Sequence, residues 1–164
     1  TDLVKKLDYE CELAVVLGRD ARDVPAGQTR DYIFGYTILN DVSARDVQTA
    51  HKQWYFGKSL DGFTPIGPCI VTADAFADYP PRLGIRSFVN GEKRQDSNTA
   101  LQIFDIDHVI AELSQGMTLK AGTIIATGTP AGVGMGMDPP QFLKPGDVVR
   151  CEIEGIGTLT NPVK

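Results

Sequence analysis

The chain has 164 residues, 42% hydrophobic and 23% charged, which is the composition of an ordinary globular domain with a full-sized core. Its net charge of −5 argues against a nucleic-acid partner, because phosphate binding needs a basic surface. No apolar run approaches the roughly 20 residues of a membrane-spanning helix and no signal peptide is visible, so we expect a cytoplasmic protein without a membrane partner.

Short apolar runs rich in β-branched residues dominate the sequence and predict strands, because glycine and proline separate them. In chain order the expected strands cover residues 12–17, 32–39, 67–72, 84–89, 122–127, 147–154 and 157–160. Asn90-Gly91 predicts a hairpin turn between two of the runs, because both residues tolerate positive φ. Residues 143–147 predict a type II turn around Pro145-Gly146.

Helical signals are few. Ser43 and Asp46 have the spacing of a capping box, which predicts a helix over roughly residues 43–53. Residues 107–113 carry apolar side chains along one helix face. We see no repeat, low-complexity tract or linker, so the sequence predicts a single domain, mainly β with a few short helices.

The three cysteines, Cys11, Cys69 and Cys151, lie far apart in the chain and form no C-x-x-C pair. Neither a zinc site nor a disulfide framework is therefore indicated. Each lies among apolar neighbours, so we predict three small core residues in a reducing compartment.

Glu10 and Glu12 are the first residues that suggest chemistry. Residues i and i+2 of a strand point to one face, so the two carboxylates project together. The following residues are apolar at consecutive positions, which indicates a strand buried on both faces. Two such carboxylates repel each other and are costly to desolvate, and a divalent cation would remove both problems. A solvated strand edge is the simpler interpretation of an isolated E-x-E.

Four more polar residues follow. Asp41 ends an apolar run, where a helix cap and a metal ligand are equally reasonable interpretations. Arg45 and Gln48 are three residues apart and therefore neighbours on the expected helix, whose polar face could also be simply solvated. Lys58 lies in a glycine-flanked loop that can bring a cation into a cleft, although an isolated lysine usually lies on the surface.

The loop of residues 126–134 contains three glycines but matches neither a Walker loop nor G-x-G-x-x-G. Its backbone N–H groups and the hydroxyls of Thr127 and Thr129 could bind an anion, or the loop could be only a tight turn. His51 and His108 have no acidic partner at a useful spacing. With oxygen ligands alone, Mg²⁺, Mn²⁺ or Ca²⁺ is preferred over Zn²⁺.

Together these motifs resemble the C-terminal catalytic domain of the fumarylacetoacetate hydrolase family. The resemblance runs along the whole chain, through residues 8–18, 35–46, 57–61, 89–92, 127–134 and 144–147. It implies a β-rich roll or sandwich and a homodimer. It also implies an ion, with Mg²⁺ first and Mn²⁺ or Ca²⁺ as alternatives, on Glu10, Glu12 and Asp41. The residues that match the family's substrate pocket are Arg45, Gln48, Lys58 and Thr129.

The expected substrate is a small 2-oxo acid, whose carboxylate and keto oxygens chelate the ion. Lewis-acid stabilisation of an enolate then permits hydrolysis of an acylpyruvate carbon–carbon bond, our preferred reaction. Oxaloacetate decarboxylation and keto–enol or dienedioate isomerisation share the same enolate. We expect Lys58, with Arg45 and Gln48, to act in catalysis, and Arg45, Gln48 and Thr129 to bind substrate. A non-catalytic, metal-dependent dicarboxylate binder is the alternative from another class.

Many members of this family carry a catalytic His–Glu pair in a lid that precedes the E-x-E strand. The chain starts at Thr1, without methionine, so we expect such a segment to lie upstream of these residues. Neither His51 nor His108 matches the position of that histidine. We therefore expect residues 1–164 alone to bind Mg²⁺ and oxalate but to turn over slowly.

Overall fold

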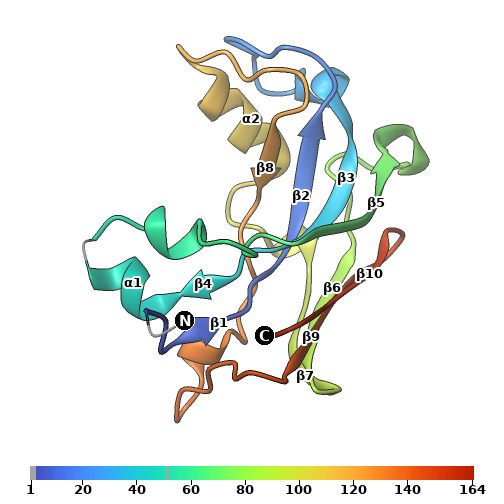
Figure 1. Ribbon diagram of the computed structural model, residues 1–164. Helices are drawn as coiled ribbons and strands as arrows, with labels where there is room; N and C mark the ends of the chain where they lie inside the picture. Colours follow the sequence, from blue (N-terminus) through green and yellow to red (C-terminus); the bar gives the residue numbers. More distant parts are fainter. Residues whose placement is uncertain (1–2, 51) are drawn as a thin grey trace.

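The computed structural model describes residues 3–50 and 52–164, whose strands form two four-stranded sheets and one two-stranded sheet (Figure 1). The strands are β1 (Leu7–Asp8), β2 (Cys11–Leu17), β3 (Ile33–Asn40), β4 (Ser43–Ala44), β5 (Ile66–Thr72), β6 (Gly84–Val89), β7 (Glu92–Asn98), β8 (Ile124–Ala126), β9 (Val148–Ile153) and β10 (Gly157–Pro162). The helices are α1 (Arg45–Ala50) and α2 (Ile106–Ser114), and short 3-10 turns cover Thr29–Tyr32, Phe56–Lys58, Ala73–Ala75, Thr99–Leu101 and Gly134–Gly136. The predicted mainly-β fold with a few short helices is confirmed.

The two larger sheets pack on each other and enclose the core. Their strand orders are β5-β3-β2-β8 and β10-β9-β6-β7, and β2 contacts both β6 and β9. The odd-numbered residues of β2, Cys11, Leu13, Val15 and Leu17, all belong to the buried core cluster. Because side chains alternate along a strand, the even-numbered residues, including Glu12, project from the opposite face. That face carries the candidate site.

The antiparallel register of β2 and β3 places Asp41 beside Glu10. Cys11 pairs with Asn40, so the residues just outside this pair face each other. The N–H of Asp41 donates to the carbonyl oxygen of Glu10 at 2.8 Å, and the N–H of Glu10 donates to Oδ1 of Asn40 at 3.0 Å. Backbone pairing thus joins two polar residues that are far apart in the sequence.

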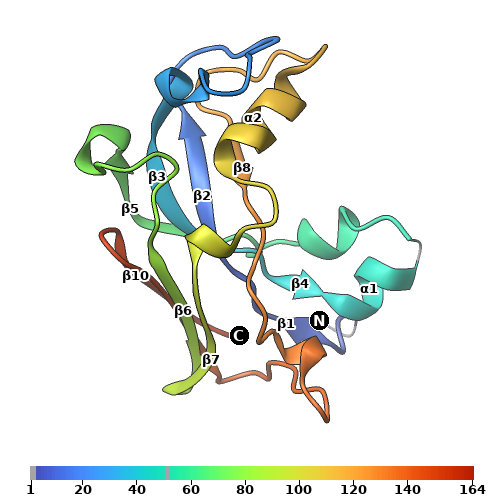
Figure 2. The same ribbon diagram turned by 180° about the vertical axis from the view of Figure 1, so that it is seen from behind.

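The small sheet of β1 and β4 brings the start of α1 against the segment that leads into β2. Asp8 pairs with Ser43, and the N–H of Arg45 donates to the carbonyl oxygen of Lys6 at 2.9 Å. Seen from behind, α1 lies with β1 and β4 at one end of the molecule, whereas α2 lies beside β8 at the other (Figure 2). The side chain of Arg45, the first residue of α1, contacts Asp8 and Glu10, which directly precede β2.

The predicted capping box at Ser43 is wrong. Ser43 belongs to β4, and its hydroxyl donates to the carbonyl oxygen of Asp41 at 2.8 Å. Its expected partner, Asp46, accepts a hydrogen bond from the N–H of Lys5 at 2.7 Å instead. The helix is consequently two residues shorter at its start than the spacing predicted, because strand pairing with β1 holds residues 43 and 44 extended.

The prediction that all three cysteines are core residues is wrong for Cys69. Cys11 and Cys151 are buried, but Cys69 is exposed. It lies on β5, an edge strand of its sheet, and every residue of β5 is at least partly exposed. Apolar neighbours in the sequence could not reveal that this strand lies at an edge.

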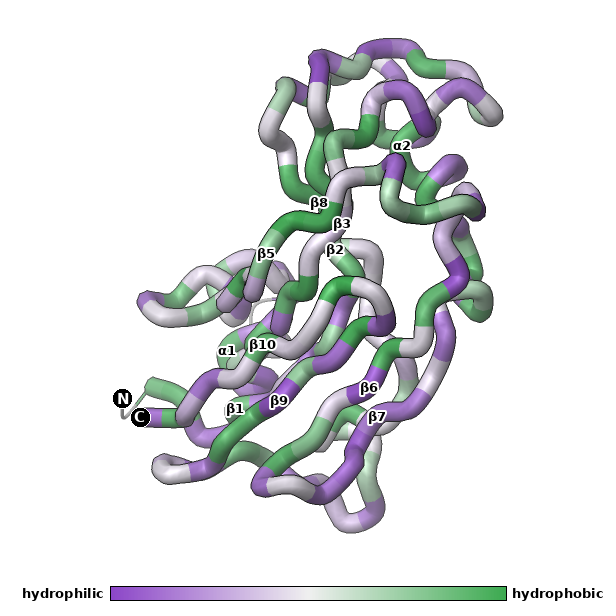
Figure 3. Tube along the Cα trace, turned by 90° about the vertical axis from the view of Figure 1, so that its right-hand side faces the viewer, coloured by the Kyte–Doolittle hydropathy of each residue, from purple (hydrophilic) through white to green (hydrophobic). Residues whose placement is uncertain are grey.

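Both predicted turns are present. Asn90 and Gly91 have φ values of 52° and 86°, and they join the paired residues Val89 and Glu92. Every second residue of the neighbouring strand β9 is buried, and after its first two residues hydrophilic and hydrophobic residues alternate (Figure 3). Gly146 has a φ of 93°, and the N–H of Asp147 closes the second turn on the carbonyl oxygen of Lys144 at 3.0 Å.

Across residues 3–50 and 52–164, no helix is long and apolar enough to cross a membrane.

Candidate metal centre

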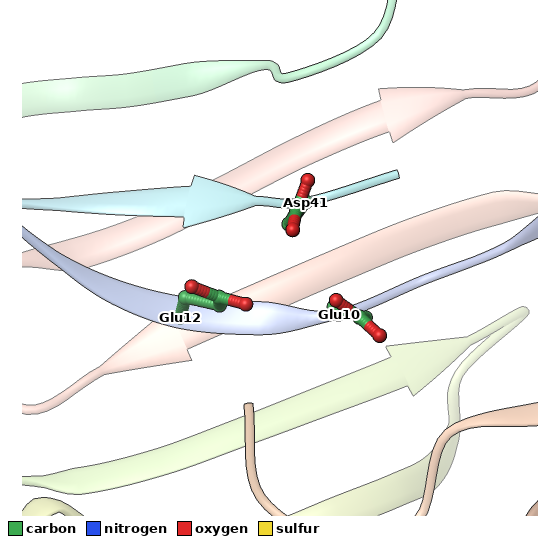
Figure 4. Close-up of side chains that lie close together, drawn as sticks. All are labelled: Glu10, Glu12 and Asp41. Carbon is green, nitrogen blue, oxygen red and sulfur yellow. The ribbon is translucent and has the colours of Figure 1, made fainter. Parts of the chain in front are cut away.

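Three carboxylates meet where β2 begins and β3 ends. Glu10 and Glu12 project from the same side of one segment, and Asp41 projects beside them from the chain just after β3 (Figure 4). Each offers an oxygen atom, and these atoms all lie within 4.8 Å of one another. An arrangement of three carboxylate oxygens suits a hard cation such as Mg²⁺, Mn²⁺ or Ca²⁺.

The cluster is buried at one end and open at the other. Glu12 is 3% exposed, whereas the side chain of Asp41 is 19% exposed. Burial is the largest cause that raises the pKa of Glu12 to about 7, and the nearby charges of Asp41 and Glu10 add to it. Burial also raises the pKa of Asp41, against the opposing effect of Lys58. Positive charge beside these two carboxylates would favour their ionised forms.

Lys58 supplies part of that charge. Its ammonium contacts Glu10 at 2.7 Å and also binds Asp41. Burial alone would lower the pKa of Lys58, but the hydrogen bonds to Asp41 and Glu10 outweigh it and raise the pKa. Lys58 is brought here by the turn Phe56–Lys58, which packs against α1. Gly57 permits that contact, because an added Cβ would lie 2.6 Å from the backbone nitrogen of Gln48.

Arg45 lies on the far side of Glu10 and is 6% exposed. Its Nη2 contacts Oε1 of Glu10 at 2.6 Å, and its Nε donates to Oδ2 of Asp8 at 2.9 Å. Its Nη1 donates to Oε1 of Gln48 at 3.2 Å, so the predicted Arg45–Gln48 contact is present. The polar face of α1 is therefore buried against the carboxylates rather than solvated.

The glycine-rich loop binds carboxylates of the protein itself. The N–H of Gly128 donates to Oε2 of Glu12 at 2.8 Å. The hydroxyls of Thr127 and Thr129 donate to the carbonyl oxygens of Leu13 and Cys11 at 2.8 and 2.9 Å. The N–H of Gly128 and the two threonine hydroxyls therefore bind groups of the protein itself, and binding of a separate anion by this loop stays a prediction.

The charges of the cluster fit one divalent cation. Asp8, Glu10, Glu12 and Asp41 are four carboxylates, and Arg45 and Lys58 are the cations that contact them. When all are ionised, two negative charges remain unbalanced, which equals the charge of one divalent ion. Burial is the main cause of the raised pKa values of Glu12 and Asp41, and the neighbouring carboxylates add to it.

Comparison with known proteins decides the family. The family described as fumarylacetoacetate (FAA) hydrolase, C-terminal, matches residues 1–164. The chain belongs to the fumarylacetoacetate hydrolase family. The resemblance seen in the sequence motifs is thus confirmed, and the chain is part of an enzyme family.

Several members of the family are close to this chain. It is 48% identical over 162 residues to the oxaloacetate tautomerase YisK of Bacillus subtilis, and the match covers 99% of this chain and 54% of YisK. A solved fumarylacetoacetate hydrolase from Exiguobacterium antarcticum is 53% identical with a TM-score of 0.96, covering 99% of this chain and 58% of that one. The solved 2-hydroxyhepta-2,4-diene-1,7-dioate isomerase of Mycobacterium marinum is 46% identical with a TM-score of 0.87, and the match covers 98% of this chain and 59% of that one. The chain thus spans about half the length of the curated relatives it matches.

The fold assembles most of the residues that the sequence singled out. The cluster consists of Glu10, Glu12 and Asp41, and it is contacted by Lys58 and Arg45. Gln48 contacts Arg45, and the hydroxyl of Thr129 donates to the carbonyl oxygen of Cys11, which lies between the two glutamates. His108 lies apart from them on α2, where it stacks on Phe104 at a centroid distance of 4.7 Å. His51 lies outside the residues that the structure describes.

Sequence reasoning gave no role to three residues that build the site. Asp8 binds Arg45, Asn40 binds the N–H of Glu10, and Gln95 accepts from the N–H of Cys11 at 3.1 Å while donating to Thr129 at 2.8 Å. Asp8 could have been noticed, because it continues the i, i+2 spacing of Glu10 and Glu12. Gln95 had no local signal, since its partners lie 84 and 34 residues away.

Proposed function

We propose that this chain forms the metal-binding core of an enzyme that acts on a small 2-oxo acid through an enolate. The observation that supports it most is the cluster of Glu10, Glu12 and Asp41 with the ammonium of Lys58 at its open side. Such a cluster offers a divalent cation three oxygen ligands, with a positive side chain beside the place where a substrate would enter.

The roles of the residues follow from their contacts. Glu10, Glu12 and Asp41 would hold Mg²⁺, with Mn²⁺ or Ca²⁺ as alternatives. A bound ion supplies Lewis acidity, which favours the enolate of a 2-oxo acid. Lys58 donates to the oxygen on which negative charge develops, because its side chain is 19% exposed and its ammonium already lies at the open side.

The remaining predicted residues, Gln48, Arg45 and Thr129, bind other groups of the protein around the carboxylates. Gln48 is buried beside Arg45 and orients it. Arg45 uses each of its three nitrogens on Asp8, Glu10 and Gln48, and Thr129 uses its hydroxyl on Cys11 and Gln95. In our proposal Arg45 and Thr129 therefore shape the substrate site chiefly by fixing Glu10 and the glycine-rich loop.

Hydrolysis of an acylpyruvate is the first candidate reaction. Water adds to the acyl carbon, the bond from that carbon to C3 of pyruvate breaks, and C3 takes up a proton. The products are a carboxylic acid and pyruvate. The likeness to a solved protein named as a fumarylacetoacetate hydrolase supports this candidate, because that name is the name of a hydrolase.

Tautomerisation of oxaloacetate is the second candidate, with decarboxylation and dienedioate isomerisation as variants on the same enolate. The 48% identity to a protein named as an oxaloacetate tautomerase supports it. Tautomerisation only moves a proton between C3 and the keto oxygen, so it uses the same ion site and the same Lys58.

Loss of enol absorbance with added Mg²⁺ tests the proposal on an acylpyruvate, fumarylpyruvate and oxaloacetate. Pyruvate released from the acylpyruvate or fumarylpyruvate, detected with lactate dehydrogenase, indicates hydrolysis. Pyruvate released from oxaloacetate indicates decarboxylation, and an absorbance change of oxaloacetate without pyruvate indicates tautomerisation. Binding of oxalate in the presence of Mg²⁺, without turnover of any of these compounds, would instead indicate a non-catalytic dicarboxylate-binding domain.

We also propose that the protein is a homodimer. A run of apolar side chains is exposed before α2, where Leu101, Ile103 and Phe104 are 75%, 92% and 61% exposed. Exposed apolar surface of this kind commonly marks an interface. Sedimentation velocity measures the oligomeric state directly, and a monomer at high concentration would contradict the proposal.

A further inference from the structure

Asp8 is a fully buried carboxylate, with 0% of its side chain exposed. Its Oδ1 accepts hydrogen bonds from the N–H groups of Tyr9 at 2.9 Å and Gly134 at 2.7 Å. Its Oδ2 accepts from the N–H of Met135 at 2.9 Å and from Nε of Arg45 at 2.9 Å. Burying an ionised carboxylate is costly unless hydrogen bonds and a counter-charge compensate, and here both are present.

The contacts continue from Asp8 to the candidate metal centre. The guanidinium of Arg45 is rigid and planar, so the bond from its Nε to Asp8 fixes the direction of its Nη2. Nη2 contacts Oε1 of Glu10 at 2.6 Å, and the other oxygen of Glu10 contacts Lys58 at 2.7 Å. Both oxygens of Glu10 are thus held, one of them through Asp8.

We propose that Asp8 is a positioning residue of the metal centre, which orients the Glu10 carboxylate through Arg45 and ties it to the turn at Gly134–Met135. This inference rests on the proposed function, because it takes Glu10 as a metal ligand. Asp8 itself touches neither the ion nor the substrate. Its effect is to keep Arg45 and Glu10 in one geometry, so that little rearrangement is needed when an ion binds.

A purely structural role for Asp8 makes a different prediction. If Asp8 only anchors the turn, its replacement lowers stability and leaves the Mg²⁺ affinity of the folded protein unchanged. If it positions Glu10, the affinity falls as well. Groups that orient metal ligands typically contribute about 10- to 100-fold to metal affinity.

The test is Asp8→Asn, with Mg²⁺ affinity measured by isothermal titration calorimetry and folding checked by circular dichroism. We expect about 10-fold or greater loss of affinity in the folded variant. Asp147→Asn is the matched control, because Asp147 also anchors a turn, accepting from Lys144 N–H at 2.7 Å and from the Asn90 side chain at 2.8 Å. It should lose stability and keep the Mg²⁺ affinity of the unaltered protein.

Arg45→Lys completes the test. A lysine keeps the charge but cannot join Asp8 and Glu10 through one rigid plane, so it too should bind Mg²⁺ about 10-fold more weakly. Because Asp8 acts through Arg45, the two substitutions together should cost little more than either alone. Additive losses, or unchanged affinity in a folded Asp8→Asn variant, would overturn the inference.

Should Asp8→Asn fail to fold, Arg45→Lys decides by itself. Unchanged Mg²⁺ affinity in that variant overturns the inference, and a loss supports it. Absence of Mg²⁺ binding by the unaltered protein is a separate outcome, which overturns the proposed function and the inference with it.

Discussion

Glu12 is the most buried of the three carboxylates, and its neighbours define what it can do. It accepts a hydrogen bond from the N–H of Gly128, whereas Glu10 contacts two cations. Burial and the charges of Asp41 and Glu10 raise its pKa to about 7, so the ionised form is disfavoured in the folded protein. A divalent ion would reverse that preference, because it favours the charged form.

Replacing Glu12 by glutamine should abolish Mg²⁺ binding and leave the protein folded. Asp41→Asn should have the same effect, measured by calorimetry. At pH 8 the metal-free Glu12→Gln variant should be at least as stable as the unaltered protein. The reason is the sign of the shift: a raised carboxyl pKa lowers folded-state stability as pH rises from the unfolded value to about 7.

Glu112→Gln is the control, since Glu112 is exposed on α2. It removes the same charge without touching the cluster, so Mg²⁺ affinity should not change. Full Mg²⁺ affinity in both Glu12→Gln and Asp41→Asn would show that the ligands are other residues, and unfolding of both would assign these acids a structural role.

Lys58→Met should lower kcat by about 10²-fold or more at saturating Mg²⁺, the usual loss when one preorganised transition-state donor is removed. The aliphatic stem is retained, so the fold should be preserved. Lys120→Met is a matched control, because Lys120 pairs with Asp20 while its side chain is 72% exposed. A change confined to KM would restrict Lys58 to substrate positioning.

Among the elements, the loop between β8 and β9 determines the geometry of the site more than any helix does. It supplies the N–H of Gly128 to Glu12 and the N–H groups of Gly134 and Met135 to Asp8. The hydroxyl of Tyr9 also donates to the carbonyl oxygen of Gly132 at 2.8 Å. The loop therefore runs along residues 8–13 and supports their carboxylates from one side.

Gly134→Ala should destabilise the protein and weaken Mg²⁺ binding together. An added Cβ would lie 1.9 Å from the carbonyl oxygen of Gln141 and 2.8 Å from Oδ1 of Asp8, so the loop must move. Overpacking of this kind typically costs about 1–3 kcal/mol. Urea unfolding and Mg²⁺ titration measure both effects.

Gly136→Ala is its matched control in the same turn, Gly134–Gly136. There the nearest atom to an added Cβ is Cγ2 of Val133 at 3.8 Å, an ordinary contact. We expect stability and metal affinity close to those of the unaltered protein. Equal behaviour of the two variants would mean that the loop at Gly134 is not tightly held.

For the whole molecule, ion binding and folding are linked. The cluster combines Glu12 of β2 with Glu10 just before that strand and Asp41 just after β3, so only the folded chain presents all three ligands. The helix α1, the turn Phe56–Lys58 and the β8–β9 loop contribute the residues around it. A ligand that binds only the folded state stabilises it by about 2.7 kcal/mol at 100 times its dissociation constant.

Saturating Mg²⁺ should therefore raise the melting temperature by roughly 5–10 °C for a chain of this size. Oxalate should raise it further only when Mg²⁺ is present, because it stands in for the chelating end of a 2-oxo acid. Differential scanning calorimetry with EDTA as the metal-free reference checks both. An oxalate shift in EDTA would place the anion on protein groups alone.

Local pattern was sufficient for much of the fold. The apolar runs predicted seven of the strands, including β6 at its observed bounds, but not β1, β4 or the polar β7. Asn90-Gly91 predicted its turn. The shared face of Glu10 and Glu12 also followed from the sequence, since side-chain alternation depends only on the strand itself. Motif resemblance, rather than periodicity, indicated that Asp41 would join them.

Tertiary structure alone decided how these residues are held. Gly128 and Glu12 are 116 residues apart, and Gly134 and Asp8 are 126 apart, so no local pattern could pair a loop amide with either carboxylate. The same holds for the exposure of Cys69 and the extended conformation of Ser43, which depend on where β5 and β4 lie in their sheets. Strand type is a property of neighbouring residues, but burial and hydrogen-bond partners depend on which distant segments pack together.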